Sequence, residues 1–343
     1  MSPRYWLIPL LAVPLVALVA LGRAPAGVDA SARYLRIAAD PSGERGFDVG
    51  SALASILSRP PGMPACRDDD RACGVQGLVA LAQSLPDRRD IVEAVASGAV
   101  ETGLAPADRI YAARCFPAPG AKPADLTILG EIYNESLHVL VRAETGLTDI
   151  AQLKGRRVAI GVAGSDERRL AERILSAYGL RRQQVRAVEI GGEQAVLALA
   201  DGRVDALFRI AAAPDPVAAM AITAGARLLP VTGDAAGRLS GLHPFGAPGA
   251  IAAGTYGPDQ GEVATMMQPV AWIAGPSLEP KLAAQLTAAL ASRANREALH
   301  RQDPDMVLLR PAAFRMSAPL HPAAGTRYGV DPIAMACPGQ KPR

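Results

Sequence analysis

Aromatic residues, histidine and clustered positive charge are all scarce in this chain of 343 residues. Phe, Trp and Tyr together make up 4% of the sequence, and the formal net charge is only +3, with Lys and Arg spread along the chain. Surfaces that bind nucleic acid combine a basic stripe with aromatic side chains that stack on bases. The composition therefore gives no support for nucleic-acid binding.

The common catalytic and phosphate-binding motifs are also missing. No Walker lysine follows Gly43 or Gly164, neither loop has the G-x-G-x-x-G spacing, and no H-E-x-x-H occurs. Ser165 ends the run "GVAGS", but a nucleophile elbow needs a glycine two residues later, where this chain has Glu167. The four histidines are scattered and none is marked as a general base. We therefore expect no enzyme activity and no cofactor.

Only four cysteines are present, and their spacing decides how they are interpreted. Cys66 and Cys73 enclose a short polar loop, which is typical of a local disulfide in an oxidising compartment. Cys115 and Cys337 lie far apart in the sequence, and they either pair or stay free. A metal site needs closer clustering of Cys and His than this chain shows, so a metal is disfavoured.

Long apolar runs are absent after the N-terminus, but residues 7–21 form an uncharged, mostly apolar stretch that follows Arg4. Val28 and Ala30 suit the −3 and −1 positions of a signal-peptidase site, so residues 1–30 are predicted to be a cleaved signal peptide. An uncleaved membrane anchor is the alternative, although the run falls short of the ~20 residues that span a bilayer comfortably. The mature protein is expected in the periplasm.

Apolar residues are abundant, at half of the chain, and their pattern repeats. The segments "IVEAVASGAVETGL" (91–104) and "AVLALADGRVDALF" (195–208) each predict a helix, a glycine stop and a short strand. Residues 35–45 and 156–168 each predict a strand that runs into a Ser/Gly loop. Alternating strands and helices indicate parallel sheets covered by helices. The repeat favours two α/β lobes over one larger α/β domain.

Four loops follow the predicted strands of this repeat. They are residues 42–47, 105–108, 164–168 and 209–215. Ligands of open α/β sheets bind at the carboxyl ends of strands, where such loops lie. Two lobes that face each other would bring all four loops into one cleft.

Some polar residues of these segments have a structural interpretation that is as good as ligand contact. Ser165 and Asp108 are placed to cap helices, and His138 lies between apolar residues as a core histidine would. Farther along the chain, residues 269–274 predict a strand and residues 279–300 predict one amphipathic helix.

Several stretches resemble the TAXI class of solute-binding proteins, which serve tripartite ATP-independent periplasmic (TRAP) transporters. The most specific are "YNESLHVLVRAETGLTDIAQLKGRRVAIGVAGS" (133–165), "GRVDALFRIAAAPDP" (202–216), "IAAGTY" (251–256) and "PLHPAAGTRY" (319–328). The resemblance runs from about residue 35 to residue 328, nearly all of the mature chain.

The resemblance implies an α/β, two-lobed periplasmic-binding-protein fold of type II. Each lobe is then a mostly parallel sheet flanked by helices, with a ligand cleft between the lobes. The limits it predicts are residues 31–138 for the first part of lobe 1, 139–255 for lobe 2 and 256–328 for the return to lobe 1. Residues 329–343 are predicted to be a loosely ordered tail.

The loops depart from the family pattern where a ligand would bind. The run "SGERGF" (42–47) stands in place of a Thr-Gly-Gly-x-Tyr-Tyr pattern, and "PAD" (106–108) in place of Gln-Ser-Asp. In the second lobe "GSDE" (164–167) replaces Gly-Ser-Gly-Thr, and Arg209 stands where a tyrosine is common. These changes put charged groups where the family has neutral ones.

Family members are associated with glutamate-like and other small carboxylate ligands, which arginine binds well. Arg45 and Arg209 are therefore the predicted carboxylate contacts, with Arg209 as the main anchor. The predicted ligand carries at least one carboxylate, and a zwitterion is one form that it can take. Three acidic residues, Glu44, Asp166 and Glu167, oppose an anion. They either face solvent, pair with the arginines or bind a cationic group.

The predicted ligand-binding residues come from the four loops and from the segment between the lobes. They are Ser42, Gly43, Glu44, Arg45, Phe47, Ala107, Asp108, Tyr133, Glu135, His138, Ser165, Asp166, Glu167, Arg209 and Ala212. The predicted function is capture of a small polar carboxylate or amino-acid-like ligand by lobe closure, for delivery to the membrane permease subunits of a TRAP transporter. A ligand sensor of the same fold that docks to a membrane receptor is the alternative, and a periplasmic hydrolase ranks below both.

Overall fold

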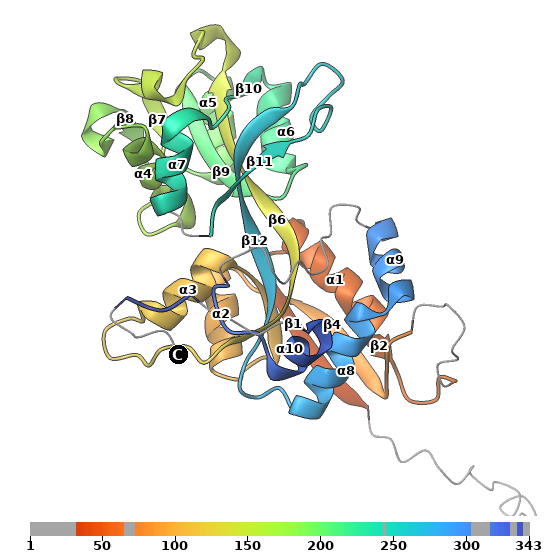
Figure 1. Cartoon of the computed structure of the whole chain (residues 1–343). Coiled ribbons are helices and arrows are strands. Elements are labelled where there is room, and N and C mark those ends of the chain that lie inside the picture. The colour runs from red at the N-terminus through yellow and green to blue at the C-terminus, as the bar shows by residue number, and fades with distance from the viewer. Residues whose placement is uncertain (1–31, 65–72, 243–244, 303–315, 330–334, 339–343) are drawn as a thin grey trace, which may run out of the picture.

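Two lobes joined by two long strands make up the described part of the computed structural model (Figure 1). The strands are β6 (Thr127–Arg142) and β12 (Val263–Ala274). The structure describes residues 32–64, 73–242, 245–302, 316–329 and 335–338. The predicted signal peptide and Cys66 lie outside these residues. Within them, no helix combines the length and the apolar character that crossing a membrane requires.

The first lobe contains a sheet with the strand order β3-β2-β4-β1-β5-β12-β6. Strand β1 runs parallel to both β4 and β5, whereas β12 is antiparallel to β5 and to β6. Its remaining strands are β1 (Arg33–Ala39), β2 (Ser58–Arg59), β3 (Val75–Gln76), β4 (Leu78–Ser84) and β5 (Thr102–Pro106). Its helices are α1 (Arg45–Leu57), α2 (Arg88–Ala96), α3 (Ala107–Cys115), α8 (Pro280–Ala291), α9 (Arg293–Gln302) and α10 (Pro322–Tyr328).

The second lobe continues the same sheet from β6 through β9, β7 and β8. Strand β7 is parallel to β8 and to β9, and β10 and β11 pair antiparallel with β6 and β12. The strands are β7 (Arg157–Ala159), β8 (Arg186–Val188), β9 (Ala206–Ala211), β10 (Ala226–Leu228) and β11 (Ala247–Ile251). The helices are α4 (Asp166–Ala177), α5 (Gly192–Ala200), α6 (Pro216–Thr223) and α7 (Gly233–Leu242), with short 3-10 turns at Ala143–Thr145, Ile150–Leu153 and Arg182–Gln184.

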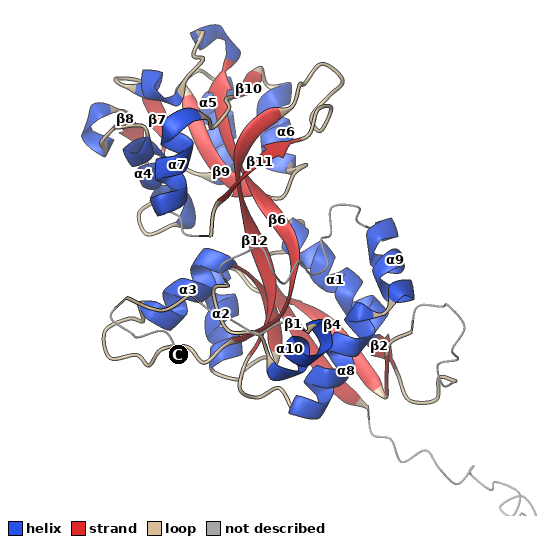
Figure 2. Ribbon diagram, viewed as in Figure 1, coloured by secondary structure: helices blue, strands red, loops and turns tan. Residues whose placement is uncertain are grey.

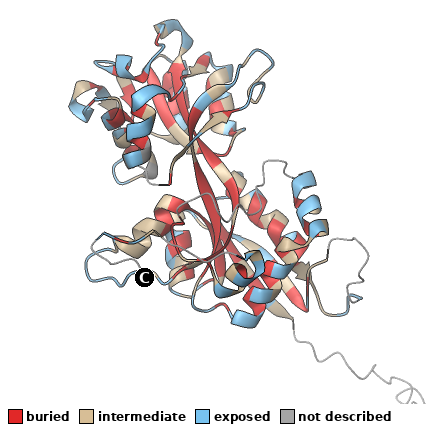
Figure 3. Cartoon of the chain, viewed as in Figure 1, coloured by how far each residue is buried: buried red, intermediate tan, exposed pale blue. Residues whose placement is uncertain are grey.

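Strands β6 and β12 connect the lobes because each pairs with strands of the first lobe along one part of its length and with strands of the second lobe along another part. Strand β6 pairs with β12 up to Ser136 and with β9 from Ser136 onward. Both strands are mostly buried where they pass between the lobes (Figure 3). The lobe limits at residues 31–138, 139–255 and 256–328 stay a prediction.

Helices flank the sheet in each lobe (Figure 2). Apolar clusters lie where these helices pack against the sheet. In the first lobe, α1 and α8 supply Leu53 and Leu286 to one cluster, and α2 supplies Ile91 to another. In the second lobe, α4 supplies Ile174 to one cluster and α5 supplies Leu199 to another. The predicted α/β fold with helix-covered lobes is confirmed. The prediction of mostly parallel sheets needs correction, because the sheet is mixed: β6 and β12, which join the lobes, pair antiparallel with their neighbours.

The internal repeat is also confirmed. Helices α2 and α5 each stop just before a glycine, Gly98 (φ 77°) and Gly202 (φ 68°), and each is followed by a strand of its own lobe, β5 and β9. Glycine ends helices well because a positive φ carries no side-chain clash for it. The same local signal therefore produced the same structure twice.

Two predicted elements need correction. The helix predicted over residues 279–300 is two helices, α8 and α9, because Ser292 adopts an extended conformation (ψ 139°) between them. The strand predicted over residues 269–274 begins earlier, at Val263, since polar residues such as Gln268 are buried inside the sheet. The apolar run at residues 269–274 therefore predicted only the second half of β12.

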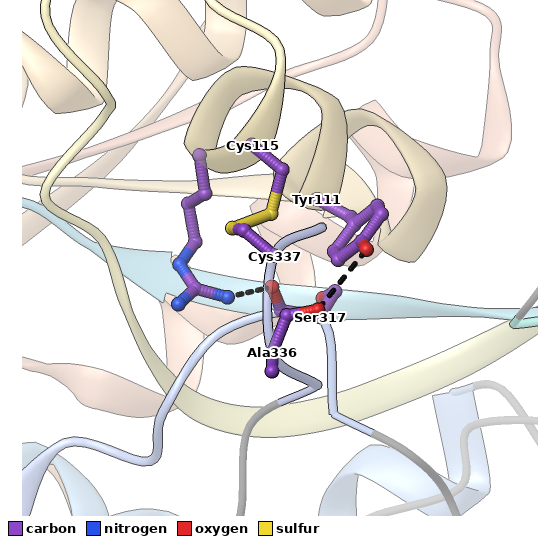
Figure 4. The surroundings of a disulfide bond; sticks show 6 residues. Tyr111, Cys115, Ser317, Ala336 and Cys337 are labelled. Carbon is purple, nitrogen blue, oxygen red and sulfur yellow. Dashed lines mark hydrogen bonds between the residues drawn. A yellow bond between two sulfur atoms is a disulfide. The ribbon is translucent and has the colours of Figure 1, made fainter. Parts of the chain in front are cut away.

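A disulfide joins Cys115, the last residue of α3, to Cys337 (Figure 4). Figure 4 also shows the Tyr111 hydroxyl donating to the Ala336 carbonyl, at 3.2 Å. Residues 335–338 of the predicted loose tail are thus attached to the first lobe, and Cys337 is buried. The sequence alone did not decide whether Cys115 and Cys337 pair or stay free. Cys73 is also disulfide-bonded, and its predicted pairing with Cys66 stays a prediction because Cys66 lies outside the described residues.

Candidate ligand cleft between the lobes

The loop after β1 and the end of β9 meet across the gap between the lobes. Glu44 lies directly before α1 in lobe 1, and its Oε2 accepts a hydrogen bond from Nη2 of Arg209 in lobe 2, at 3.3 Å. Glu44 is the N-cap residue of α1, but its side chain makes no capping bond. Its carboxylate is therefore directed to the other lobe. Of the three alternatives predicted for Glu44, which were facing solvent, pairing with an arginine or binding a cationic group, the structure shows pairing with an arginine.

Arg209 is held mainly by its own lobe. Its Nε and Nη2 donate to the two carboxylate oxygens of Asp215, at 2.6 and 2.7 Å. Asp215 is 2% exposed, and it also caps α6 by accepting a bond from the backbone N–H of Ala218. The bidentate pair fixes the guanidinium plane at the mouth of the second lobe. Glu44 occupies a third position on the same cation.

Behind Arg209, four residues form a hydrogen-bonded chain. The Tyr256 hydroxyl accepts from the backbone N–H of Asp215 at 2.8 Å and lies 2.6 Å from Nε2 of His138. Nδ1 of His138 lies 2.9 Å from the Ser136 carbonyl oxygen. Since a carbonyl only accepts, Nδ1 carries the proton and Tyr256 donates to Nε2. Burial lowers the pKa of His138 from 6.5 to about 4, so this imidazole is neutral at pH 7.

His138 makes folding sensitive to acid. An unfolded histidine binds a proton below pH 6.5 whereas the folded one resists protonation down to about pH 4, so stability falls as pH drops through this window. At about 1.4 kcal/mol per unit of pKa difference, we expect a loss of up to about 3 kcal/mol. Urea unfolding across pH 4 to 7 measures it, and NMR of the imidazole should show His138 titrating near pH 4.

The matched control for this prediction is His138→Gln, which removes the titration. Burial raises the pKa of Glu131 to about 7, and this carboxyl opposes the trend because it stabilises the folded state at low pH. Glu131 is present in both proteins, so its contribution cancels in the difference. Equal slopes of stability against pH in the parent and in His138→Gln would contradict the prediction.

A buried charged cluster lies beside the cleft, where β6 joins the lobes. Arg88, the first residue of α2, contacts Oε1 of Glu135 at 2.6 Å and Oδ1 of Asp40 at 3.1 Å. The side chain of Gln268 on β12 donates from Nε2 to Oε2 of Glu135, at 2.8 Å. Glu135 is 1% exposed; burial raises the pKa of its carboxyl and the charge of Arg88 opposes that shift. Glu135 is therefore held by lobe 1 and by the connecting strand.

Gly46 explains one departure from the family pattern. It lies in the first turn of α1, and a Cβ added there would overlap the carboxylate of Asp40. That carboxylate is bound by Arg88, so it has little freedom to move away. A tyrosine does not fit at position 46 while Asp40 and Arg88 stay paired.

In the second lobe, the loop before α4 is held by its own backbone. Ser165 accepts from the backbone N–H of Arg168 at 3.1 Å and caps α4, as predicted. Glu167 accepts from the backbone N–H of Gly192 at 3.3 Å and lines a small cavity with Arg209. The side chain of Asp166 lies outside what the structure describes.

The start of α3 corrects one structural prediction. Asp108 is not the N-cap; the N-cap is Pro106, because α3 already begins at Ala107, and Asp108 lies in its first turn. The carboxylate of Asp108 reaches Arg173 of α4, in the other lobe, at 3.8 Å. This is a second charged contact across the cleft, and it is weaker than the first because the distance is longer.

The other predicted residues divide between the surface and the core. Ser42 and Gly43 are exposed, Arg45 and Phe47 are partly buried, and Ala107 is buried. Tyr133 and Ala212 are buried in the apolar cluster of the first lobe, although Ala212 follows β9 of the second. The structure thus brings Glu44, Arg209 and Glu167 together, whereas Ser42 and Gly43 face solvent.

The sequence alone did not identify Arg88, Asp40, Gln268, Arg169 and Arg173, and it placed Asp215 only at the end of the loop 209–215. Arg88 stands in "PDRRD", which is typical of an exposed helix start and gives no sign of burial. Gln268 did carry a signal, because it is a polar residue between apolar ones in "MMQPV". An isolated polar residue in a buried strand needs a hydrogen-bond partner.

One small cavity lies within the second lobe, and another lies between the two lobes. One, of about 10 Å³, is lined by Glu167 and Arg209, and the other, of about 20 Å³, lies between Arg88, Arg169 and Gln268. A cavity of the second size has room for one water molecule. The lobes are therefore in contact in this structure. In the described residues, no group of three or more His, Cys, Asp or Glu side chains is placed to hold a metal ion.

The fold and the cleft define a class, the two-lobed α/β periplasmic-binding-protein fold. A crystal structure of a TctC solute binding protein from Polaromonas has this fold, with a TM-score of 0.50 and 16% identity over 81% of this chain and 90% of that chain. The family model described as NMT1-like matches residues 37–328, and the chain belongs to the NMT1-like family.

Two further structures are similar at a TM-score of 0.48. The periplasmic aliphatic sulphonate binding protein SsuA from Escherichia coli is 17% identical over 90% of this chain and 96% of that chain. PhnD1 from Prochlorococcus marinus, in complex with methylphosphonate, is 11% identical over 80% of this chain and 92% of that chain.

Proposed function

We propose that this protein is a periplasmic solute-binding protein that captures a small polar ligand between its lobes and delivers it to a membrane transporter. The observation that carries the proposal is the contact between Glu44 and Arg209, one from each lobe, at the ends of strands β1 and β9. Closure of two lobes around a ligand is a well-known switching motion, and it needs no chemistry. The finer assignment to the TAXI class and to a TRAP transporter rests on the sequence resemblance.

Glu44 also indicates what Arg209 binds. Its carboxylate contacts the guanidinium of Arg209 between the lobes, and its side chain is 39% exposed. The side chain of Asp215, which contacts the same guanidinium, is 1% exposed. When the lobes separate, the contact to Glu44 is lost and the contact to Asp215 is kept. A ligand carboxylate can then take the place of Glu44 on Arg209.

The charge around Arg209 favours a ligand that is not purely anionic. Glu44 and Asp215 bind the guanidinium directly. Burial lowers the pKa of Arg209, but Asp215 above all, with Glu44 and Glu167, raises that pKa above its ordinary value. A carboxylate that displaces Glu44 leaves Glu44 without its cation, and a positive group on the same ligand would restore the balance. A zwitterionic, amino-acid-like ligand therefore fits this site best.

A thermal-shift screen with small carboxylates and amino acids tests the anchor. We expect at least one of them to raise the melting temperature of the parent and of Arg203→Ala, and to leave that of Arg209→Ala unchanged. Arg203 is the matched control because its side chain is 62% exposed and pairs only with the equally exposed Asp201 among the contacts described here. Glu44→Gln should bind carboxylates more tightly than the parent, since the competing internal carboxylate is gone.

The outcomes separate the parts of the proposal. If no compound stabilises the parent, the ligand class is wrong. If a carboxylate stabilises Arg209→Ala as well as it stabilises the parent, Arg209 is not the anchor. Weaker carboxylate binding by Glu44→Gln would show that Glu44 helps to hold the ligand instead of competing with it.

A further inference from the structure

Phe245 is a buried aromatic residue in an irregular segment of the second lobe. It lies between α7 and β11 and is 4% exposed. Within the part of the chain that the structure describes, it belongs to none of the four apolar clusters that fill the lobes. Its burial therefore does not come from the apolar clusters of its own lobe.

The ring of Phe245 packs against Tyr111 of α3, which belongs to the first lobe. The ring centroids are 5.2 Å apart and the ring planes meet at 64°, an edge-to-face arrangement that aromatic pairs favour. The Tyr111 ring also meets Phe116 of its own lobe, with the centroids 5.9 Å apart. Separation of the lobes would break the contact with Phe245 and keep the contact with Phe116.

One face of α3 carries both of these contacts to the second lobe. Asp108 and Tyr111 are three residues apart and Cys115 follows four residues later, so the three side chains share one side of the helix. Asp108 reaches Arg173 at a distance of 3.8 Å, and neither side chain is fully buried. A long, partly exposed ion pair contributes little, whereas an aromatic pair removes apolar surface from water. The contact between Tyr111 and Phe245 is therefore the stronger of the two.

The C-terminal segment holds Tyr111 on the side away from Phe245's lobe. The Tyr111 hydroxyl donates to the Ala336 carbonyl at 3.2 Å, and the next residue, Cys337, forms the disulfide with Cys115 (Figure 4). Cys115 is one helical turn beyond Tyr111. The disulfide thus keeps the hydrogen-bond acceptor of Tyr111 beside α3.

The same end of α3 is also tied to the connecting strand β6. Nη1 of Arg114 donates to the Ser317 carbonyl oxygen at 2.5 Å. Three residues later, Leu320 forms a β-bridge with Ile128 of β6, and both residues are buried. The segment that receives the bond from Arg114 therefore links α3 to a strand that joins the lobes.

We propose that Phe245 and Tyr111 form a closure contact between the lobes. The C-terminal residues 335–338 position Tyr111 for this contact, because the disulfide keeps them beside α3. A contact that is present only in the closed form shifts the equilibrium between open and closed molecules toward the closed form. The inference rests on the proposed function, since capture depends on lobe closure, but it requires no particular ligand.

The distance between the lobes in the ligand-free protein tests the contact. Pulsed electron paramagnetic resonance measures it between spin labels on unnatural amino acids at two exposed positions, Glu93 of α2 and Leu197 of α5. We expect Phe245→Ala to raise the ratio of open to closed molecules about tenfold, because an aromatic pair and its buried surface are lost. Phe116→Ala is the matched control. It should leave the ratio unchanged, because its ring meets Tyr111 within one lobe.

Two further variants test the role of the C-terminal residues. Tyr111→Phe keeps the ring and removes the hydroxyl that donates to Ala336, and it should raise the ratio about threefold. Cys115→Ser/Cys337→Ser removes the disulfide and should shift the ratio in the same direction. Neither change should add to the effect of Phe245→Ala, because the contact that they support is then already absent. Tyr111→Phe leaves the disulfide in place, so it tests the positioning role if the double variant does not fold.

The outcomes distinguish the closure contact from the proposed ligand site. Equal ratios in Phe245→Ala and Phe116→Ala overturn the closure contact, and Phe245→Leu, which keeps an apolar side chain, replaces Phe245→Ala if that variant does not fold. A shift in Tyr111→Phe that is equally large when Phe245 is absent overturns the positioning role of residues 335–338. No ligand enters the measurement, so either result leaves the proposed carboxylate site intact. Failure of every carboxylate to bind would in turn leave the closure contact intact.

Discussion

Replacing Arg88 by methionine is expected to lower the free energy of unfolding by about 3–5 kcal/mol, because it leaves two buried carboxylates without their cation. The side chains of Glu135 and Asp40 are 1% and 8% exposed, and Arg88 contacts both. Arg88 opposes the rise that burial causes in the pKa of Glu135, so its loss raises that pKa further. Chemical denaturation at several pH values measures the effect.

The dependence on pH has a definite sign in this variant. A carboxyl whose folded pKa lies above its unfolded value stabilises the folded state while it is protonated, and this stabilisation is lost as pH rises. Arg88→Met should therefore be most destabilised at high pH and least at low pH. The double variant with Glu135→Gln should recover part of the loss, since one uncompensated charge is gone.

Arg89 provides the control for Arg88. It is the next residue of α2, its side chain is 55% exposed, and its partner Asp87 is 42% exposed. Exposed pairs of this kind contribute little, so Arg89→Met should change stability by less than about 1 kcal/mol. If Arg88→Met and Arg89→Met lower the free energy of unfolding by the same amount, the contacts of Arg88 with Glu135 and Asp40 do not stabilise the packing of α2 against β6.

The second large effect is expected for Asp215→Ala, which should cost about 3–5 kcal/mol. Asp215 binds both Nε and Nη2 of Arg209 and caps α6, so one substitution removes a buried ion pair and a helix cap. The Arg209 side chain is 12% exposed and is left with Glu44 from the other lobe. We also expect carboxylate binding to weaken, because the guanidinium is no longer held in one plane.

Two matched variants separate the contributions of Asp215. Asp215→Asn keeps an oxygen that caps α6 and removes the charge, so it should cost less than Asp215→Ala and weaken ligand binding to a similar degree. Asp201→Ala removes a carboxylate that is 63% exposed and paired with Arg203, and it should leave both stability and binding nearly unchanged. Urea unfolding and calorimetry give the two readouts. A cost for Asp215→Ala that matches Asp201→Ala would contradict the prediction.

The fold was largely predictable because its signals are local. Residues 35–45 indicated β1 and the loop that follows it, and the glycines at 98 and 202 ended the two repeated helices. The capping role of Ser165 was likewise readable from three neighbouring residues. Where two local signals competed, prediction failed: the apolar face of residues 279–300 concealed the break at Ser292.

The candidate site was predictable only in part, because its partners are far apart in the sequence. The loops that carry Glu44 and Arg209 could be named, and pairing of Glu44 with an arginine was one of three alternatives. The sequence did not choose among the alternatives, because the contact joins residues 165 positions apart. Arg88 and Glu135 were not recognised as partners for the same reason. A charged residue at a helix start has the same sequence signature whether it faces water or a buried carboxylate.

The sequence by itself determined the α/β class, the two-lobed repeat and the loops that form the cleft, since each follows from periodicity and turn residues within a few positions. Only the tertiary structure decided which charges meet. Asp215 holds Arg209, Glu44 reaches it from the opposite lobe, and Gln268 donates to Glu135 beside Arg88. The physical reason is that electrostatic and hydrogen-bond energies depend on distance and burial in space, and neither is encoded by neighbouring residues.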